Sequence, residues 1–250
     1  MPNRSRQGPR VPTSTFETIG FVTSAGGLQN EDRAGHRGNI AWVIDGATDV
    51  LEDRLLPAAS DAEWYAEQLH NQLIRHGDDG VASLAQLLDE VTRELAGRFA
   101  AAVKRPPREI HEYPSAAGVI IRKSAEAMEI LSLGDCELIT AAGAAGATAL
   151  GIDDRLRVRD RGTALAMRAV RDEGAQSWKE ARKLLWPRFR TARANLNQPG
   201  GYPVFSIIPP PAEMVSIKVL AVPAGAPMLL ASDGFMRLVE RDFQRIPLVR

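Results

Sequence analysis

The sequence contains a single cysteine, Cys136, and no long uninterrupted run of apolar residues. One cysteine excludes an intramolecular disulfide and a zinc site built from several cysteines, and it is typical of a protein from a reducing compartment. No segment approaches the roughly 20 apolar residues that a helix needs to cross a bilayer. The sequence therefore predicts a cytoplasmic protein that has no membrane partner.

The sequence also lacks an excess of charge of either sign, because 31 Lys and Arg residues balance 31 Asp and Glu residues. A protein that binds nucleic acid usually carries a basic excess, so this balance argues against nucleic acid as a partner. Hydrophobic residues make up 44% of the 250 residues, which is sufficient for one substantial core. We expect a disordered leader at 1–14 and one folded domain at 15–250.

The hydrophobic periodicity predicts strands, then helices, strands, a helix and further strands. Strands are expected at 16–23, 40–44, 116–122, 127–135, 136–141, 213–222 and 226–234, and helices at 60–76, 81–103 and 163–195, with another beginning at 235. The alanine- and glycine-rich residues 141–151 lack the lysine of a phosphate-binding loop and are expected to form a plain loop. This order favours a mixed α+β domain over repeated βαβ units.

Three of the predicted strands end at an aspartate that has a glycine beside it: Asp45 with Gly46, Asp135 and Asp233. A buried carboxylate is costly unless a partner compensates its charge, and several carboxylates at neighbouring strand ends would repel one another. Oxygen-only ligands favour hard divalent ions such as Mg²⁺ or Mn²⁺. One Asp-Gly pair is a common turn signal, but three of them, preceded by the acidic segment 30–33, favour a metal centre.

The segments NEDR, AWVIDGATD, SLGDC and LLASDGF follow one another in the order and at the intervals of known motifs. Over roughly residues 16–239 the sequence resembles the metal-dependent protein phosphatases (PPM, the protein phosphatase 2C type). The resemblance implies an α+β fold, a four-layer α-β-β-α sandwich of two packed, mainly antiparallel sheets with flanking helices. It also implies that a water bridging two Mn²⁺ or Mg²⁺ ions hydrolyses phosphoserine or phosphothreonine in a phosphoprotein substrate.

The resemblance also implies a role for each acidic position. The metal ligands would be, in chain order, Glu31, Asp45, the carbonyl oxygen of Gly46, Asp135 and Asp233. Asp45 would bridge both ions, and Asp135 would attend a third, weaker site. Asp32 and Asp45 would be the catalytic residues, with Asp32 holding metal-bound water without contacting the metal itself.

Three positions depart from the pattern of the family. Gly27 stands where members often carry an arginine that binds the substrate phosphate, and Arg33 is the nearest residue that could take this role. Cys136 replaces a serine and is expected to be buried as a small hydrophobic residue, since no histidine is placed to activate it. The chain ends at Arg250 without the further strands and the aspartate that complete the metal site of the family, so these C-terminal strands are expected to be missing.

Three functions follow from these observations. The leading hypothesis is a metal-dependent Ser/Thr protein phosphatase in cytoplasmic signalling. A catalytically impaired, phosphatase-like module that binds a signalling partner is the alternative, and a hydrolase of small phosphate esters is the third. The arginine-rich residues 155–195 are expected to form either a solvated helical face or a docking element that recognises an acidic phosphoprotein.

Overall fold

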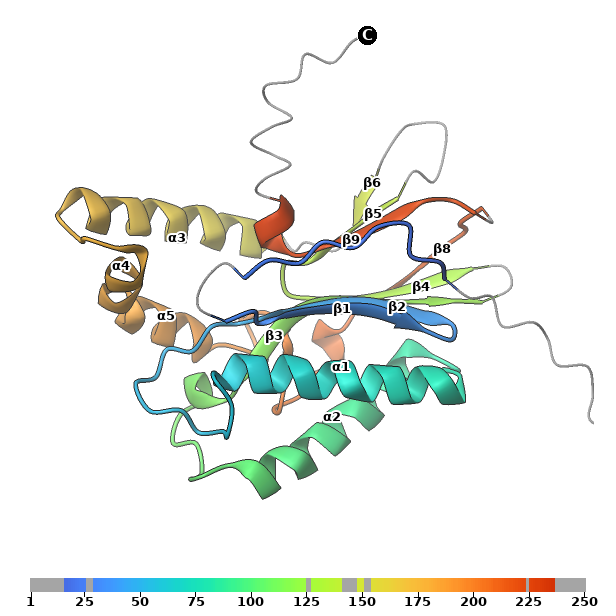
Figure 1. Ribbon diagram of the computed structural model, residues 1–250, viewed down its shortest axis with the longest axis horizontal. Helices are drawn as coiled ribbons and strands as arrows, with labels where there is room; N and C mark the ends of the chain where they lie inside the picture. Colours follow the sequence, from blue (N-terminus) through green and yellow to red (C-terminus); the bar gives the residue numbers. More distant parts are fainter. Residues whose placement is uncertain are drawn as a thin grey trace, which may run out of the picture.

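The computed structural model describes residues 16–236, apart from 26–28, 125–126, 141–147, 151–153 and 224. Within these residues the chain forms two antiparallel β-sheets with helices beside them (Figure 1). The larger sheet contains β1 (Asp32–Arg37), β2 (Ile40–Gly46), β3 (Ser115–Lys123), β4 (Met128–Leu133) and β8 (Ile217–Leu220) in that order, and β7 (Phe205–Ser206) pairs with β3. The smaller sheet has the order β6 (Thr148–Leu150), β5 (Glu137–Thr140) and β9 (Met228–Ala231).

Two long helices cover the face of the larger sheet that is turned away from the smaller one (Figure 1). They are α1 (Asp61–Asp79) and α2 (Leu84–Ala102). Each begins at a serine, Ser60 or Ser83, whose side chain accepts a hydrogen bond from the backbone N–H three residues later. The core between these helices and the sheet is built from fully buried side chains, among them Ile40, Trp42, Ile44, Tyr65, Leu69, Leu95 and Ile120.

A second core fills the space between the two sheets. Ala41 and Val43 of β2 contribute to it together with Val119 and Leu138. Successive side chains of a strand point to opposite faces, so β2 is covered by helices on one face and by the smaller sheet on the other. Asp45 lies on the same face of β2 as Ala41 and Val43, and its side chain therefore enters the space between the sheets.

Three further helices, α3 (Asp154–Asp172), α4 (Trp178–Leu184) and α5 (Trp186–Arg193), extend from one end of the sandwich (Figure 1). Arginine side chains of α4 and α5 donate hydrogen bonds to backbone carbonyl oxygens of residues 47–53, the loop that follows β2. Two short 3₁₀ helices, η1 (Ile110–Glu112) and η2 (Ala212–Met214), complete the described elements. None of the helices in the described part of the chain is both long and apolar enough to cross a membrane.

The expected fold class is confirmed, since the chain is α+β with two mainly antiparallel sheets and flanking helices. The predicted strand at 16–23 is wrong, because this segment pairs with none of the described strands. Ile19 and Val22 are 88% and 82% exposed, whereas Phe16 packs against the core between the sheets. The first strand is instead β1, whose sequence DRAGHR shows no apolar alternation and which is held by its antiparallel pairing with β2.

Two other element predictions also need correction. The segment 141–151, expected to be a loop, contains the short strand β6, which pairs with β5. The helical region expected from 163 begins at Asp154 and is divided into α3, α4 and α5. The predicted leader and the chain from 237 onward lie outside the described residues.

Candidate metal centre

The antiparallel pairing of β1 with β2 places Asp32 directly opposite Asp45. Residues that are directly opposite in an antiparallel pair point to the same face of the sheet, so both carboxyl groups enter the space between the two sheets. On its other side Asp45 lies opposite Ala117 of β3. The β1–β2–β3 register therefore fixes two of the predicted site residues side by side.

Asp135 is positioned by the tight turn that follows β4. Gly134 in this turn has a φ of +91°, and a Cβ atom there would lie 2.5 Å from the Cβ of Ala117. Only glycine accepts both this backbone conformation and the close approach. Because Ala117 is the cross-strand neighbour of Asp45, the turn brings Asp135 to the same end of the sandwich.

Asp233 comes from the smaller sheet, where a helical turn begins just after β9. The hydroxyl of the preceding Ser232 donates a hydrogen bond of 3.5 Å to Oδ2 of Asp32. This contact joins the end of β9 to the start of β1, although the two residues are 200 positions apart in the sequence. The four aspartates predicted from the sequence therefore lie together at one end of the sandwich, on or next to strands of both sheets.

The electrostatics of the site show that these aspartates face one another. Burial raises the pKa of Asp45 well above its usual range, and the negative charges of Asp233, Asp32 and Asp135 raise it further. Burial and the charge of Asp233 also raise the pKa of Asp32. The thiol of Cys136 is buried as expected, and its pKa is raised by burial and by the same four aspartates. The cluster is therefore an accumulation of like charge.

The chemistry of this donor set fits a hard divalent cation. Among the described residues, no three His, Cys, Asp or Glu side chains are close enough together to form a complete metal site. The aspartates nevertheless supply only oxygen donors, and the described salt bridges include neither Asp32 nor Asp45. A bound Mn²⁺ or Mg²⁺ would relieve the repulsion that raises their pKa values.

Glu31 and Gly46 lie next to each other at the edge of this cluster. The N–H of Gly46 donates a 3.1 Å hydrogen bond to the carbonyl oxygen of Glu31, and a Cβ at Gly46 would lie 2.7 Å from that oxygen. The carboxylate of Glu31 accepts hydrogen bonds from the hydroxyls of Thr48 and Ser60, at 2.5 and 2.6 Å. Glu31 is thereby held at the N-terminus of α1, since Ser60 is the N-cap of that helix.

Arg33 lies on the opposite face of β1 from Asp32. Its Nε donates to Glu67 of α1 at 2.6 Å, and its Nη1 donates to the carbonyl oxygens of Asn30 and Asp32 at 2.9 and 2.8 Å. The guanidinium is thus engaged by α1 and by the backbone. Its predicted contact with the substrate phosphate stays a prediction, and Gly27 lies outside the described residues.

Sequence reasoning missed two arginines that bind beside Glu31. Arg182 of α4 and Arg193 of α5 both donate to the carbonyl oxygen of Thr48, at 3.0 and 2.7 Å. Burial raises the pKa of the neighbouring Asp49 to about 6, although that carboxylate accepts hydrogen bonds from the first turn of α1. The arginine-rich composition of 155–195 was the available signal, but it did not indicate which arginines reach the site.

Comparisons with known proteins identify the fold. No family model matches the sequence, and no curated protein is detectably similar to it. The structure is similar to that of the serine/threonine phosphatase PstP/Ppp of Mycobacterium tuberculosis, with a TM-score of 0.51 and 13% identity over 85% of this chain and 76% of that one. The catalytic domain of PstP in complex with two manganese ions gives the same score and identity over 91% and 83% of the two chains.

A third structure, the serine/threonine phosphatase Stp1 of Staphylococcus aureus, has a TM-score of 0.54 and 12% identity over 95% of this chain and 84% of that one. Identities of this size establish similarity of fold. They agree with the arrangement of sheets described above. The chain therefore has the fold of the metal-dependent serine/threonine protein phosphatases.

Proposed function

We propose that this protein uses Mn²⁺ or Mg²⁺ to hydrolyse phosphoserine or phosphothreonine in protein substrates. The observation that carries the proposal is the convergence of Asp32, Asp45, Asp135 and Asp233 at one end of the sandwich, where burial and the charges of the other three raise the pKa of Asp45. Carboxylates that destabilise one another are expected where a cation completes the site. The similarity of fold to phosphatases supports the same conclusion.

In this proposal the chain supplies the ligands and positions the substrate. Asp45 would bridge two ions, with Asp233 on one and Glu31 and the Gly46 carbonyl on the other, while Asp135 would attend a third. When bound, the ions would withdraw negative charge from the phosphoryl group and promote attack by water. Asp32 would orient the attacking water through its carboxylate.

One observation favours the second candidate, a phosphatase-like module that binds a partner without turnover. The carboxylate of Glu31 is already engaged by two hydroxyls, and no three-ligand metal site is formed among the described residues. Metal binding in the phosphatase would require Glu31 to exchange the hydroxyls of Thr48 and Ser60 for the ion. In a binding module these hydrogen bonds would persist.

The test is phosphate release by the full chain from a phosphothreonine peptide and from p-nitrophenyl phosphate, with Mn²⁺, with Mg²⁺ and with EDTA. The proposal predicts metal-dependent hydrolysis of the peptide that EDTA abolishes and that excess Mn²⁺ restores. Hydrolysis of the small ester alone would replace the proposal with a small-ester hydrolase. No hydrolysis by a protein that is folded by circular dichroism would leave the binding module.

A further inference from the structure

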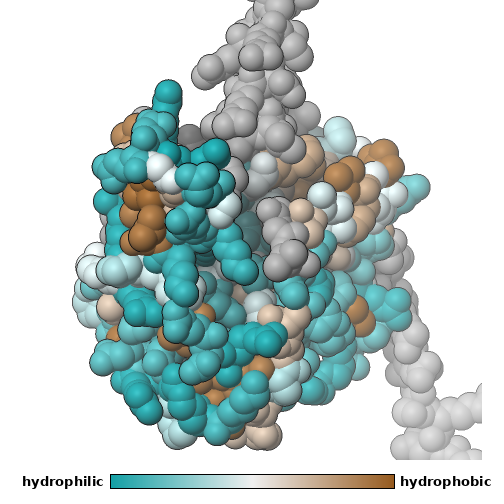
Figure 2. Space-filling model, turned by 60° about the vertical axis from the view of Figure 1, so that its left-hand side comes forward, coloured by the Kyte–Doolittle hydropathy of each residue, from teal (hydrophilic) through white to brown (hydrophobic). Residues whose placement is uncertain are grey.

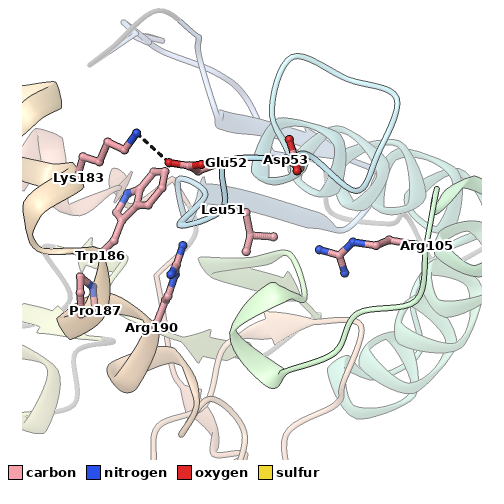
Figure 3. Close-up of a pocket in the computed structure, with 8 residues that line it drawn as sticks. All are labelled: Leu51, Glu52, Asp53, Arg105, Lys183, Trp186, Pro187 and Arg190. Atoms are coloured by element: carbon pink, nitrogen blue, oxygen red, sulfur yellow. Dashed lines mark ion pairs between the residues drawn. The ribbon is translucent and has the colours of Figure 1, made fainter.

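A cavity of about 440 Å³ lies between the loop that leaves β2 and the helices α4 and α5 (Figure 3). Lys183, Trp186 and Arg190 line it from the helices, and Leu51 and Glu52 line it from the loop. None of these residues belongs to the aspartate cluster. The cavity is therefore a separate feature on the surface beside the proposed active site.

The helical side of the cavity presents two cations on either side of one indole ring. Lys183 Nζ lies 5.4 Å and Arg190 Cζ lies 5.3 Å from the ring centroid of Trp186. Arg190 is also fixed by a hydrogen bond of 2.9 Å from its Nε to the carbonyl oxygen of Val50. Cation–π contacts of this kind hold both charged groups in place without neutralising them.

The anionic partners on this side are few. Lys183 forms a 2.8 Å salt bridge with Glu52, but the two side chains are 63% and 68% exposed. A pair this exposed is weak, and another anion can replace Glu52 on Lys183. Arg190 also acts on the charge of Glu52, and its hydrogen bond to Val50 uses Nε, so displacement of Glu52 would leave both cations to the ligand.

Among the described residues, the opposite side of the cavity has no excess of positive charge, because its one cation has two carboxylates near it. Arg105 donates to Glu112 at 2.6 Å, and the charge of Asp53 acts on the same guanidinium. In Figure 3, Arg105 and Asp53 lie on the far side of Leu51 from Lys183, Trp186 and Arg190. The positive potential of the cavity is thus confined to its helical half.

The surroundings of the cavity suit a polar occupant. The face of the molecule that includes α4 and α5 is predominantly hydrophilic (Figure 2). Leu51 follows Asp45 by six residues, so the loop between them spans at most about 20 Å. An extended peptide advances about 3.3 Å per residue, and one that reaches from the aspartates to the cavity needs no more than about six residues.

We infer that the helical half of this cavity binds an acidic side chain of the phosphoprotein substrate, held by Lys183 and Arg190 beside Trp186. The inference rests on the proposed phosphatase activity and adds a substrate preference to it. The acidic group, an Asp or Glu carboxylate or a second phosphate, displaces Glu52 from Lys183. This acidic group lies within about six residues of the phosphorylated residue, because the loop from Asp45 to Leu51 spans at most about 20 Å.

The experiment compares phosphothreonine peptides that carry one Asp at two to six positions from the phosphorylated residue, on either side, with a peptide that carries none. At low ionic strength the best acidic peptide is expected to exceed the neutral one in kcat/KM by about three- to tenfold, as expected for one or two exposed charge pairs. Lys183→Gln should reduce this ratio by about half or more, since only Arg190 then remains to hold the acidic group. The matched variant Lys179→Gln, on the same helix at an exposed position, should keep the ratio of the native protein.

A ratio of one in the native protein, or an undiminished ratio in Lys183→Gln, would overturn the inference. A binding measurement separates this failure from failure of the proposed function. Fluorescence anisotropy of the labelled acidic peptide in EDTA requires no turnover, and binding should weaken in Lys183→Gln and with added salt. If no peptide is hydrolysed but this loss of binding is observed, the cavity inference stands without the phosphatase. Equal binding by both lysine variants would contradict it.

Discussion

At one end of β3, Ala117 lies opposite Asp45, and at the other end Arg122 lies opposite Glu129 of β4. Glu129 accepts hydrogen bonds of 2.6 and 2.9 Å from Arg122 and one of 3.1 Å from the N–H of Leu84 at the start of α2. These bonds lower the pKa of Glu129, whereas burial and neighbouring carboxylates raise the pKa of Asp45. The two strands beside β3 therefore carry different carboxylates: Glu129 of β4 is paired with a cation at one end, and Asp45 of β2 is surrounded by other carboxylates at the other end.

This comparison separates carboxylates whose partners stabilise the folded protein from carboxylates whose mutual repulsion a bound cation would relieve. Glu129 contributes stability through its partners, because its ionised form is favoured in the folded protein. The ionised form of Asp45 is disfavoured in the metal-free protein, so ionisation of the aspartate cluster costs stability. A carboxylate that weakens its own fold at neutral pH is a candidate for function.

The largest effect is expected at Asp45. Asp45→Asn keeps the size of the side chain but removes a ligand charge, and peptide turnover with Mn²⁺ should fall by about 10²–10³-fold or more. Steady-state phosphate release measures this loss. Asp89→Asn, at an exposed position on α2, is the control and should leave the rate unchanged. A rate for Asp45→Asn within threefold of the native protein would remove Asp45 from the site.

The next effect concerns the turn that positions Asp135. Gly134→Ala forces a side chain into a φ of +91° and against Ala117, and should lower the free energy of unfolding by roughly 2–4 kcal/mol. Urea denaturation of the metal-free protein measures it. Gly80→Ala also places alanine at positive φ, +81°, but with nothing within 4 Å. Equal losses in both variants would show that close packing beside Asp45 contributes nothing.

A smaller effect is expected at the paired end of β3. Glu129→Gln leaves the guanidinium of Arg122, whose side chain is 14% exposed, without its carboxylate and should cost about 1–3 kcal/mol at pH 7. Because the pKa of Glu129 is lowered in the folded protein, its contribution is present above about pH 4.3 and is lost as the pH falls below that value. Urea denaturation at pH 7 and at low pH should therefore show that the difference in free energy of unfolding between the native protein and Glu129→Gln becomes smaller on acidification. An equal difference at both pH values would contradict the assignment.

The smallest effect is expected at Arg33, whose side chain is 22% exposed and paired with Glu67. Arg33→Gln should lower stability by about 0.5–1 kcal/mol, and Glu67→Gln should do the same, since either change breaks one partly exposed pair. We expect KM for the phosphopeptide to stay within twofold in both. A tenfold rise in KM for Arg33→Gln alone would instead support the phosphate-binding role that the sequence suggested.

The parts of the fold that could be predicted depend on local signals. The apolar run before Asp45 predicted a strand at 40–44, and this strand is covered by α1 on one face and by the smaller sheet on the other. The start of the helix expected at 60–76 also depends on local signals, because the N-cap Ser60 bonds a backbone N–H only three residues later. The segment 16–23 has the composition of a strand but finds no partner among the described strands, and β1 forms through pairing alone.

The candidate site was predictable only where motifs carried it. Asp45, Asp135 and Asp233 were predicted by their positions at strand ends, and Asp32 by the acidic segment 30–33 and the family resemblance. The structure brings all four together. The engagement of Glu31 by Thr48 and Ser60 depends on how the loop 47–53 meets α1, which no short-range pattern reveals. Arg182 and Arg193 reach Thr48 across 134 and 145 residues of sequence, so their contacts arise from tertiary packing alone.

The central claim is that the aspartate cluster binds a divalent cation. Isothermal titration of the metal-free native protein with Mn²⁺, beside Asp45→Asn and Asp89→Asn, tests it most directly and does not depend on the substrate. The account predicts saturable binding by the native protein and by Asp89→Asn, accompanied by a higher melting temperature, and the loss of both in Asp45→Asn. Absence of Mn²⁺ binding by a folded native protein, or unchanged binding by Asp45→Asn, would contradict it.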